Sequence, residues 1–143
     1  MNKENTEYLY KTYPILYQQA GLSPQESCMH WGFETGDGWF DLIDRLSKMM
    51  EDYNHTEEGK ENPCVALQVK EKYGSLRFYH NGGNDEICDA VWKAEEESEN
   101  ICEGCGAQPA TLESDMGWYS TMCDSCRDEK RALREKLYEV DDE

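Results

Sequence analysis

The clearest hydrophobic pattern in the chain is helical and lies between Gly36 and Tyr53. In GDGWFDLIDRLSKMMEDY, apolar residues recur every three or four positions, and the acidic residues fall largely on the other side. This spacing is typical of an amphipathic helix with one buried face. We expect a helix with Asp37 as its N-cap, because Asp readily accepts from the first free backbone N–H groups. The predicted apolar face consists of Trp39, Ile43, Leu46, Met50 and Tyr53.

Three other segments show the same helical spacing. Residues 3–20 carry recurring tyrosines and leucines, and we expect that helix to be interrupted or restarted at Pro14, since proline has no N–H to donate. Another helix begins at Asn84 or Asp85, both suitable N-caps, and runs into the first cysteine pair. A terminal helix follows Cys126 and has an acidic end.

Residues 64–80 alternate between apolar and polar in the manner of two paired strands. Tyr73 and Gly74 form the expected turn between them, because glycine adopts turn conformations without steric cost. The side chains predicted to share one face of the first strand are Val65, Leu67 and Val69.

The predicted order is therefore helix, helix, hairpin, helix, second hairpin and helix. Strands paired locally and helices kept apart from them are typical of the α+β class. We expect a small antiparallel β-sheet that carries helices, with a four-cysteine zinc ribbon at the C-terminal end. Residues 1–99 would form the α+β domain and residues 100–143 the ribbon and terminal helix, packed together as one compact unit.

Two Cys-x-x-Cys pairs are the strongest chemical signal in the chain. Seventeen residues separate Cys102 and Cys105 from Cys123 and Cys126, within the spacing of structural zinc sites. Two residues between cysteines make a tight turn that aims both sulfur atoms at one point. Four thiolates close a tetrahedral shell and leave no position for a substrate. We therefore expect one Zn²⁺ with a structural role and no catalytic site.

The residues around the cysteines fit this interpretation. Gly104 and Gly106 ease the first turn, and the intervening segment would run out and back as a hairpin, with Trp118 and Tyr119 covering the metal. The alternatives are four free thiols, a redox pair or an iron–sulfur cluster. A redox motif needs only one Cys-x-x-Cys, and clusters favour other spacings.

Composition narrows the functions that this fold can serve. The 143 residues include 14 basic and 31 acidic side chains, which gives a net charge of −17. No apolar run approaches the ~18 residues needed to cross a bilayer, and the N-terminal segment has no apolar signal-peptide region. The remaining cysteines, Cys28, Cys64 and Cys88, are expected as reduced thiols, because an odd total argues against a disulfide framework. We expect a cytoplasmic protein without a membrane partner.

The acidic residues concentrate on either side of the predicted hairpin. Residues 25–62 carry a net charge of −7 and residues 85–99 a net charge of −6, which is more than one solvated helix face needs. We interpret them as a surface that imitates the phosphates of DNA and binds a partner protein with a basic surface. Simple solubility is the alternative. The candidate partner-binding residues are Asp37, Asp41, Asp44, Glu51, Asp52, Asp85, Glu86, Asp89, Glu95 and Glu96.

One basic element offers a second interpretation. Lys70, Lys72 and Arg77 lie on the predicted hairpin among stackable rings, a combination typical of nucleic-acid contact. Because acidic segments flank the hairpin, these cations more readily pair with carboxylates inside the protein, and we do not expect direct nucleic-acid binding.

Two further constellations could hold metals. Glu34, Asp37 and Asp41 near His30 could serve a metal-dependent hydrolase, although no phosphate-binding loop accompanies them. A second metal site could use the three other cysteines with the histidines, but their spacing is irregular. The residues concerned are Cys28, His30, His55, Cys64, His80 and Cys88.

Four sequence blocks together resemble a family of phage and prophage proteins with a C-terminal zinc-ribbon-like element. The blocks are GFETGDGWFDLIDRLS, LQVKEKYGSLRFY, AEEESENICEGCG and GWYSTMCDSC, and they extend from about Tyr13 to Cys126. The resemblance implies that the four paired cysteines occupy the family's metal positions, and it implies no particular activity. With the acidic charge, it leads us to expect a non-enzymatic phage accessory protein that binds, and inhibits, a host or defence protein that handles nucleic acid.

Overall fold

The computed structural model describes the backbone of residues 1–141 and the side chains of residues 1–137. Its body is built on a three-stranded sheet with the order β1 (Phe33–Glu34), β2 (Val65–Lys72) and β3 (Ser75–Asn81). Strands β2 and β3 are antiparallel, as predicted. The short β1 pairs with β2 in parallel, so the sheet is mixed rather than purely antiparallel. The α+β class is confirmed.

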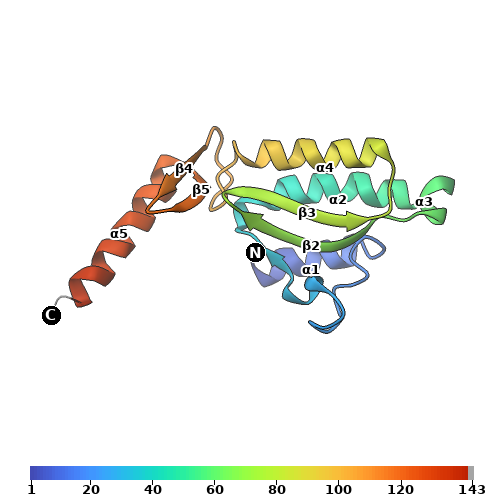
Figure 1. The fold of residues 1–143 in the computed structure, drawn as a ribbon, viewed down its shortest axis with the longest axis horizontal. Coiled ribbons are helices and arrows are strands. Elements are labelled where there is room, and N and C mark those ends of the chain that lie inside the picture. The colour runs from blue at the N-terminus through green and yellow to red at the C-terminus, as the bar shows by residue number, and fades with distance from the viewer. Residues whose placement is uncertain (142–143) are drawn as a thin grey trace.

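Helices cover one side of this sheet (Figure 1). In Figure 1, α2 lies between α4 and α1, behind the hairpin of β2 and β3. The helices of the body are α1 (Lys3–Thr12), α2 (Phe40–Asn54), α3 (Glu57–Glu61) and α4 (Asp85–Ser98). Two 3₁₀ turns, η1 (Cys28–Trp31) and η2 (Asp37–Trp39), lie between α1 and α2.

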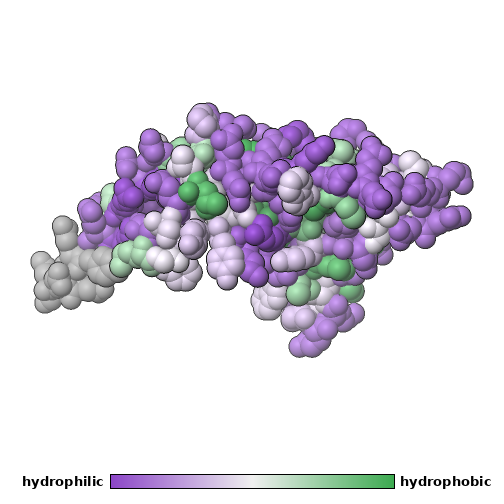
Figure 2. Space-filling view, turned by 45° about the horizontal axis from the view of Figure 1, so that its top comes forward, coloured by the Kyte–Doolittle hydropathy of each residue, from purple (hydrophilic) through white to green (hydrophobic). Residues whose placement is uncertain are grey.

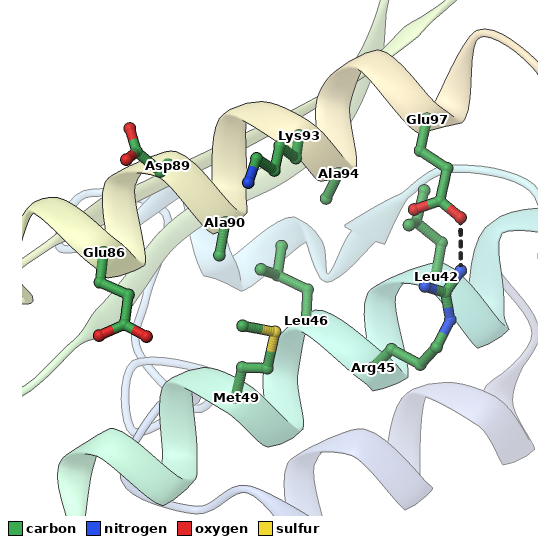
Figure 3. A pocket seen from close by; sticks show the side chains of 10 residues that line it. All are labelled: Leu42, Arg45, Leu46, Met49, Glu86, Asp89, Ala90, Lys93, Ala94 and Glu97. Carbon is green, nitrogen blue, oxygen red and sulfur yellow. Dashed lines mark hydrogen bonds and ion pairs between the residues drawn. The ribbon is translucent and has the colours of Figure 1, made fainter.

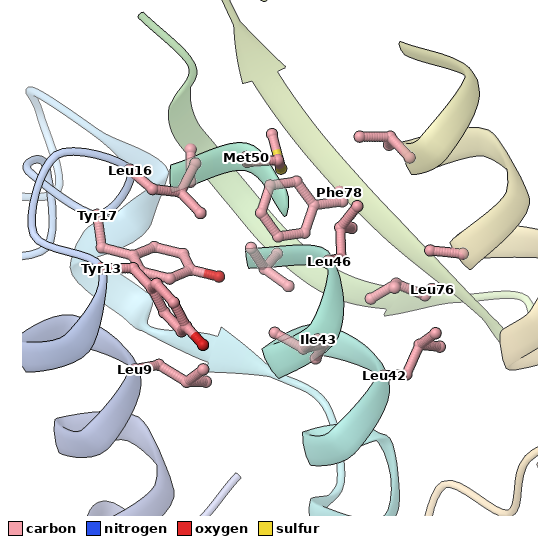
Figure 4. Packing of buried hydrophobic residues seen from close by; sticks show 14 of the residues in the cluster. Leu9, Tyr13, Leu16, Tyr17, Leu42, Ile43, Leu46, Met50, Leu76 and Phe78 are labelled. Atoms are coloured by element: carbon pink, nitrogen blue, oxygen red, sulfur yellow. The ribbon is translucent and has the colours of Figure 1, made fainter. Parts of the chain in front are cut away.

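The hydrophobic core lies between α2, the sheet and the segment that follows α1 (Figure 4). Residues Ile43, Leu46 and Met50 of α2 face Leu16 and Phe78, and all five are at least 97% buried. A fully buried side chain of this size contributes roughly 1.5–3 kcal/mol relative to an exposed one. This packing explains why the helical pattern of α2 was the strongest signal in the sequence.

The helix predicted for residues 3–20 ends at Thr12, so the interruption expected at Pro14 is confirmed, but no helix restarts between Pro14 and Ala20, and that part of the prediction is wrong. After Pro14 the chain continues as turns, and the amides of Ile15 and Leu16 donate to the carboxylate of Glu51, each at 3.0 Å. Glu51 is only 5% exposed, so its carboxylate satisfies backbone groups that a continued helix would have paired.

Asp37 is not the N-cap of α2, because that position belongs to Trp39. Asp37 lies one turn earlier, in η2, and its Oδ1 accepts from the backbone N–H of Asn2 at 2.7 Å and from the side chain of Asn5 at 3.3 Å. It therefore ties the start of α1 to the loop before α2. By contrast, Asn84 caps α4 as predicted, accepting from the Ile87 amide at 2.9 Å.

The hairpin turn forms where predicted, with Tyr73 at φ 54° and Gly74 at φ 85°. Two successive positive φ values suit the right-handed twist of a two-residue hairpin. The predicted alternation in β2 is wrong, because a bulge shifts the register between Ala66 and Gln68. Ala66 and Val69 are buried as a result, whereas Val65 and Leu67 are only half-buried.

Helix α4 protects the open edge of β3. Ser98 accepts from the amide of Leu76, and the carboxylate of Glu95 accepts from the amide of Phe78, both at 2.9 Å. Unpaired edge amides would otherwise invite pairing with another chain. The same contacts fix the end of α4, from which the chain enters the first cysteine pair.

The C-terminal part consists of a second hairpin and a long helix. Strands β4 (Thr111–Asp115) and β5 (Trp118–Met122) pair in antiparallel fashion, and α5 (Asp124–Asp141) follows. Figure 1 shows α5 extending away from the body, with the hairpin between the two. These elements agree with the predicted ribbon and terminal helix.

Candidate metal centre

The four paired cysteines meet at one point, as predicted. Their Sγ atoms all lie within 4.8 Å of one another, and those of Cys105 and Cys123 are 3.7 Å apart. A tetrahedral shell with metal–sulfur bonds of about 2.3 Å places its sulfur atoms about 3.8 Å apart. The arrangement therefore fits a single metal ion held by Cys102, Cys105, Cys123 and Cys126, with no open position for a substrate.

Backbone geometry explains why the first pair converges. The Gly106 amide donates to the Cys102 carbonyl at 2.8 Å, which closes the turn between the two cysteines. Gly106 has φ +84°, a conformation that glycine adopts without strain. A Cβ on Gly104 would lie 3.4 Å from the Cys126 sulfur and 3.7 Å from that of Cys102, so this residue packs directly against the sulfur atoms.

The protonation states of the thiols also favour a cation. Burial opposes ionisation of Cys102, but backbone N–H groups of Cys123, Cys105 and Gly104 donate toward its sulfur, and its pKa is lowered to about 6. The pKa of Cys126 is raised, because its thiol lies against the sulfur atoms of the other three cysteines. Four thiolates this close repel one another unless a metal ion neutralises them.

The metal centre is packed against the loop that carries the GDGW sequence. The carbonyl and carboxylate oxygens of Glu103, between the first two cysteines, accept from the amides of Gly38 at 2.8 Å and Gly36 at 2.9 Å. A Cβ on Gly38 would lie 2.0 Å from the Cys102 carbonyl oxygen, and one on Gly36 would lie 2.3 Å from that of Glu103. Only glycine fits at these two positions.

Trp39, which follows Gly38, strengthens the contact between this loop and the first cysteine pair. The Trp39 indole is fully buried and donates to the Ile101 carbonyl at 2.9 Å, just before the first cysteine. The two elements are thus joined by a buried hydrogen bond as well as by backbone proximity.

The β2–β3 turn supplies the second contact of the ribbon with the body. The Thr121 hydroxyl, fully buried, donates to the Gly74 carbonyl at 2.6 Å. A Cβ on Gly74 would lie 2.2 Å from Cδ1 of Leu112 in β4. The glycine of this turn therefore permits both the turn conformation and the close approach of the ribbon.

Arg127 fixes α5 to the hairpin one residue after the last cysteine. Its side chain is buried and donates to the carbonyl oxygen of Thr111 at 2.8 Å, while its Nε lies 2.9 Å from a carboxylate oxygen of Glu113. Because α5 begins at Asp124, between the last two cysteines, metal binding and the docking of α5 are structurally linked.

The aromatic residues of the ribbon do not cover the metal, and that prediction is wrong. Trp118 and Tyr119 lie at the closed end of the hairpin, opposite Asp115 and Ser114, whereas the cysteines lie at its open end. Trp118 is 77% exposed, and Tyr119 makes an edge contact with Tyr73 of the body. Sequence reasoning missed their exposure, because alternation within a five-residue strand does not say which face is covered.

The predicted acidic residues separate into three groups. Glu51 is buried and hydrogen-bonded within the core, so its assignment to a partner surface is wrong. Three others accept hydrogen bonds inside the protein: Asp37, Asp44 from the Tyr13 hydroxyl, and Glu95. The remaining six are exposed on α2 and α4, and one of them, Asp52, also pairs with Lys48 at 2.8 Å: Asp41, Asp52, Asp85, Glu86, Asp89 and Glu96.

Part of this exposed set lines a cleft between α2 and α4 (Figure 3). Leu42 and Leu46 form its apolar floor with Met49, and the α4 side carries Glu86, Asp89 and one cation, Lys93. The cleft encloses about 330 Å³ and adjoins a second hollow that shares Met49 and Glu86. Acidic residues that we had not assigned also line these hollows: Glu57, Glu58 and Glu97.

The hairpin cations proposed for nucleic-acid contact are not gathered into one site. The cations of the basic hairpin form no ion pair with the carboxylates described in residues 1–137, so the expected pairing is wrong. Arg77 donates to Ser75 and to the Leu76 carbonyl, while Lys72 lies over the Tyr73 ring at 5.6 Å. Lys70 is half-buried opposite Arg77 on β2.

Within residues 1–137, the four paired cysteines form the one group of histidine, cysteine and acidic side chains arranged to hold a metal. The carboxylates near His30 do not meet there as a hydrolase site, and the other cysteines and histidines form no second group.

Comparison with known proteins identified no relative of this chain. No family model, curated protein or solved structure matches the chain significantly, so the resemblance to phage proteins stays a prediction. In the part of the chain that the structure describes, no helix has both the length and the apolar character to cross a membrane.

Proposed function

We propose that the protein is a non-enzymatic phage accessory protein that binds a basic segment of a host or defence protein through the acidic cleft between α2 and α4. One Zn²⁺ in the four-cysteine site would serve a structural role, because zinc is the usual occupant of a closed tetrahedral thiolate shell. The partner would be a protein that handles nucleic acid, and the acidic face would occupy its basic groove and inhibit it.

The observation that carries this proposal is the combination of an apolar floor (Figure 3) with a rim that is acidic on balance. Across the cleft and the adjoining hollow, the cations Arg45 and Lys93 are outnumbered by six carboxylates, those of Asp52, Glu57, Glu58, Glu86, Asp89 and Glu97. Leu46 is almost fully buried, but Met49 leaves 49% of its surface to water at the centre of the helix pair. A flexible methionine in such a place adapts to different apolar side chains. A basic segment with apolar residues would satisfy both the floor and the rim.

The two ends of the cleft differ, and one of them limits the length of the partner segment that could bind. Arg45 bridges to Glu97 at 2.9 Å and closes one end. At the other end the cleft continues toward Asp52, Glu57 and Glu58. Figure 2 shows hydrophilic side chains over most of the visible face, with few hydrophobic spots. Met49 is one of several exposed apolar side chains, and it differs from them in lying between two helices with carboxylates on both sides.

Charge reversal in the cleft tests the proposal. Zinc-loaded protein is immobilised as the wild type, as a Glu86→Lys/Asp89→Lys variant and as a control, Glu7→Lys/Glu135→Lys, with the same charge change on exposed sites elsewhere. Proteins captured from host cells are identified, and their retention is measured as salt rises. We expect a basic nucleic-acid-handling protein that both wild type and control retain, that the cleft variant loses and that salt releases.

Competition with DNA then tests the inhibition. DNA and this protein should exclude each other from the captured partner. Equal retention by the wild type and the cleft variant, or retention insensitive to salt, would contradict the proposal.

A further inference from the structure

A second cleft, of opposite charge, lies between the β4–β5 hairpin and α5, far from the acidic one. Four cationic side chains line one wall because they recur on a single face of α5: Arg127, Lys130, Arg131 and Arg134. The hairpin contributes Trp118, Ser120 and Met122 to the opposite wall, and the cleft encloses about 310 Å³. In a chain with a net charge of −17, such a concentration of cations is exceptional.

Two carboxylates partly balance these cations. Glu113 lies against Nε of Arg127, and Asp115 lies 2.6 Å from Arg134 and 3.9 Å from Arg131. Lys130 forms no ion pair with the residues whose side chains are described. The cleft therefore keeps an excess of positive charge, and Asp115 occupies the place that an external anion would take.

Trp118 gives the cleft a second property. It is the most exposed large apolar residue among those described, with 77% of its surface in water. An indole face next to cations is a platform on which a nucleic-acid base stacks while its phosphate meets the positive charges.

The walls of the cleft are fixed rather than loosely apposed. Arg127 is only 6% exposed and holds the carbonyl oxygens of Thr111, Ser120 and Met122. One residue earlier, Cys126 belongs to the metal centre. A ligand would therefore meet a preformed site, which lowers the entropic cost of binding.

We propose that this cleft binds a nucleotide, with its phosphate on the cationic face of α5 and its base stacked on Trp118. Free nucleotide and a unit of single-stranded nucleic acid both fit this description, because both present the same phosphate and base. The negative body of the protein does not prevent this contact. Helix α5 extends away from the body (Figure 1), and salt screens charges over about 8 Å at physiological ionic strength.

Binding measurements on the zinc-loaded full chain test this proposal. The probes are a fluorescent oligothymidylate of about ten nucleotides, in the range that one single-strand-binding fold covers, and thymidine 5′-monophosphate. Inorganic phosphate and oligoglutamate serve as comparison anions. We expect the oligonucleotide, the mononucleotide or both to bind better than either comparison anion, and to bind less well as salt rises. Binding of the oligonucleotide alone identifies a strand as the source, and equal binding of the mononucleotide identifies free nucleotide.

Matched variants locate the binding. Trp118→Ala and Lys130→Ala should each weaken nucleotide binding by about tenfold. Their controls, Trp92→Ala on α4 and Lys136→Ala on another face of α5, should not. Asp115→Asn should strengthen binding, because it removes the competing carboxylate, whereas Glu135→Gln should leave it unchanged.

Several outcomes would overturn the proposal. They are the absence of nucleotide binding, equal binding of inorganic phosphate or oligoglutamate, and full binding by Trp118→Ala and Lys130→Ala. Unchanged zinc content and circular dichroism show that a variant has kept its fold. Because these variants leave the cleft between α2 and α4 intact, failure here is independent of the proposed partner binding.

Discussion

Gly38 and Cys102 lie in contact through their backbones, although 64 positions separate them in the sequence. A Cβ on Gly38 would stand 2.0 Å from the Cys102 carbonyl oxygen and 2.6 Å from the Gly106 amide nitrogen. The metal-binding turn therefore packs directly on the loop before α2, at Gly36 and Gly38. This contact makes the ribbon a fixed part of the molecule rather than an appendage.

This close packing predicts that a single added methyl group at Gly38 strongly destabilises the folded protein. Gly38→Ala should lower the free energy of unfolding by about 1–3 kcal/mol, because the neighbouring backbone must shift to admit it. Gly21→Ala is the matched control, since a Cβ there meets nothing within 4 Å and should change stability by less than about 0.5 kcal/mol. Urea unfolding of zinc-loaded protein measures both. Equal stability of the two variants would show that the ribbon does not pack on this loop.

The buried carboxylate of Glu51 should contribute more to the free energy of unfolding than the exposed carboxylates do. Glu51 accepts from the amides of Ile15 and Leu16, so Glu51→Gln turns one acceptor into a donor that faces an N–H group. We expect a loss of about 2 kcal/mol, because a buried amide is left unpaired. Glu57→Gln, on the exposed α3, removes the same charge and should cost little. Denaturation midpoints compare the two variants directly, and similar midpoints would contradict the structural role of Glu51.

The seven cysteines should react with iodoacetamide in distinct classes. Burial raises the pKa of Cys64 to about 11, so near pH 8 very little of it is thiolate, and it is also fully buried. Cys28 and Cys88 are exposed and should be modified first, while the metal protects the four paired cysteines. Mass spectrometry should therefore find two fast sites in the zinc-loaded protein and six after chelation, because loss of the metal releases the turn that buries Cys102. Fast modification of Cys64 in the native protein would contradict its burial.

The elements that sequence patterns predicted are those governed by neighbouring residues. The apolar spacing of α2, the Asn84 cap and the Tyr73–Gly74 turn depend on a few consecutive residues, and each formed as expected. The convergence of the four cysteines was equally local in origin, because two tight turns set the direction of the sulfur atoms.

The elements that were missed depend on contacts between distant segments. The two residues of β1 become a strand only by pairing with β2, and the bulge at Ala66 depends on how the sheet meets the core. Likewise, the glycines of GDGW were interpreted as part of a helix start, whereas Cys102 and Glu103, more than sixty residues away, explain them. A signal was nevertheless present, since two glycines flank the aspartate at the predicted helix start, where residues with better helix propensity would serve a helix alone.

We propose that one metal ion, zinc, held by the four paired cysteines secures the ribbon to the body. The most direct measurement is the zinc content of natively purified protein by mass spectrometry, compared with that of Cys105→Ser. We predict about one zinc ion per chain in the wild type, a large loss in the variant, and a lower unfolding midpoint for both the variant and the chelated wild type. Wild-type protein that contains no metal, yet unfolds at the same midpoint with or without added zinc, would contradict the account.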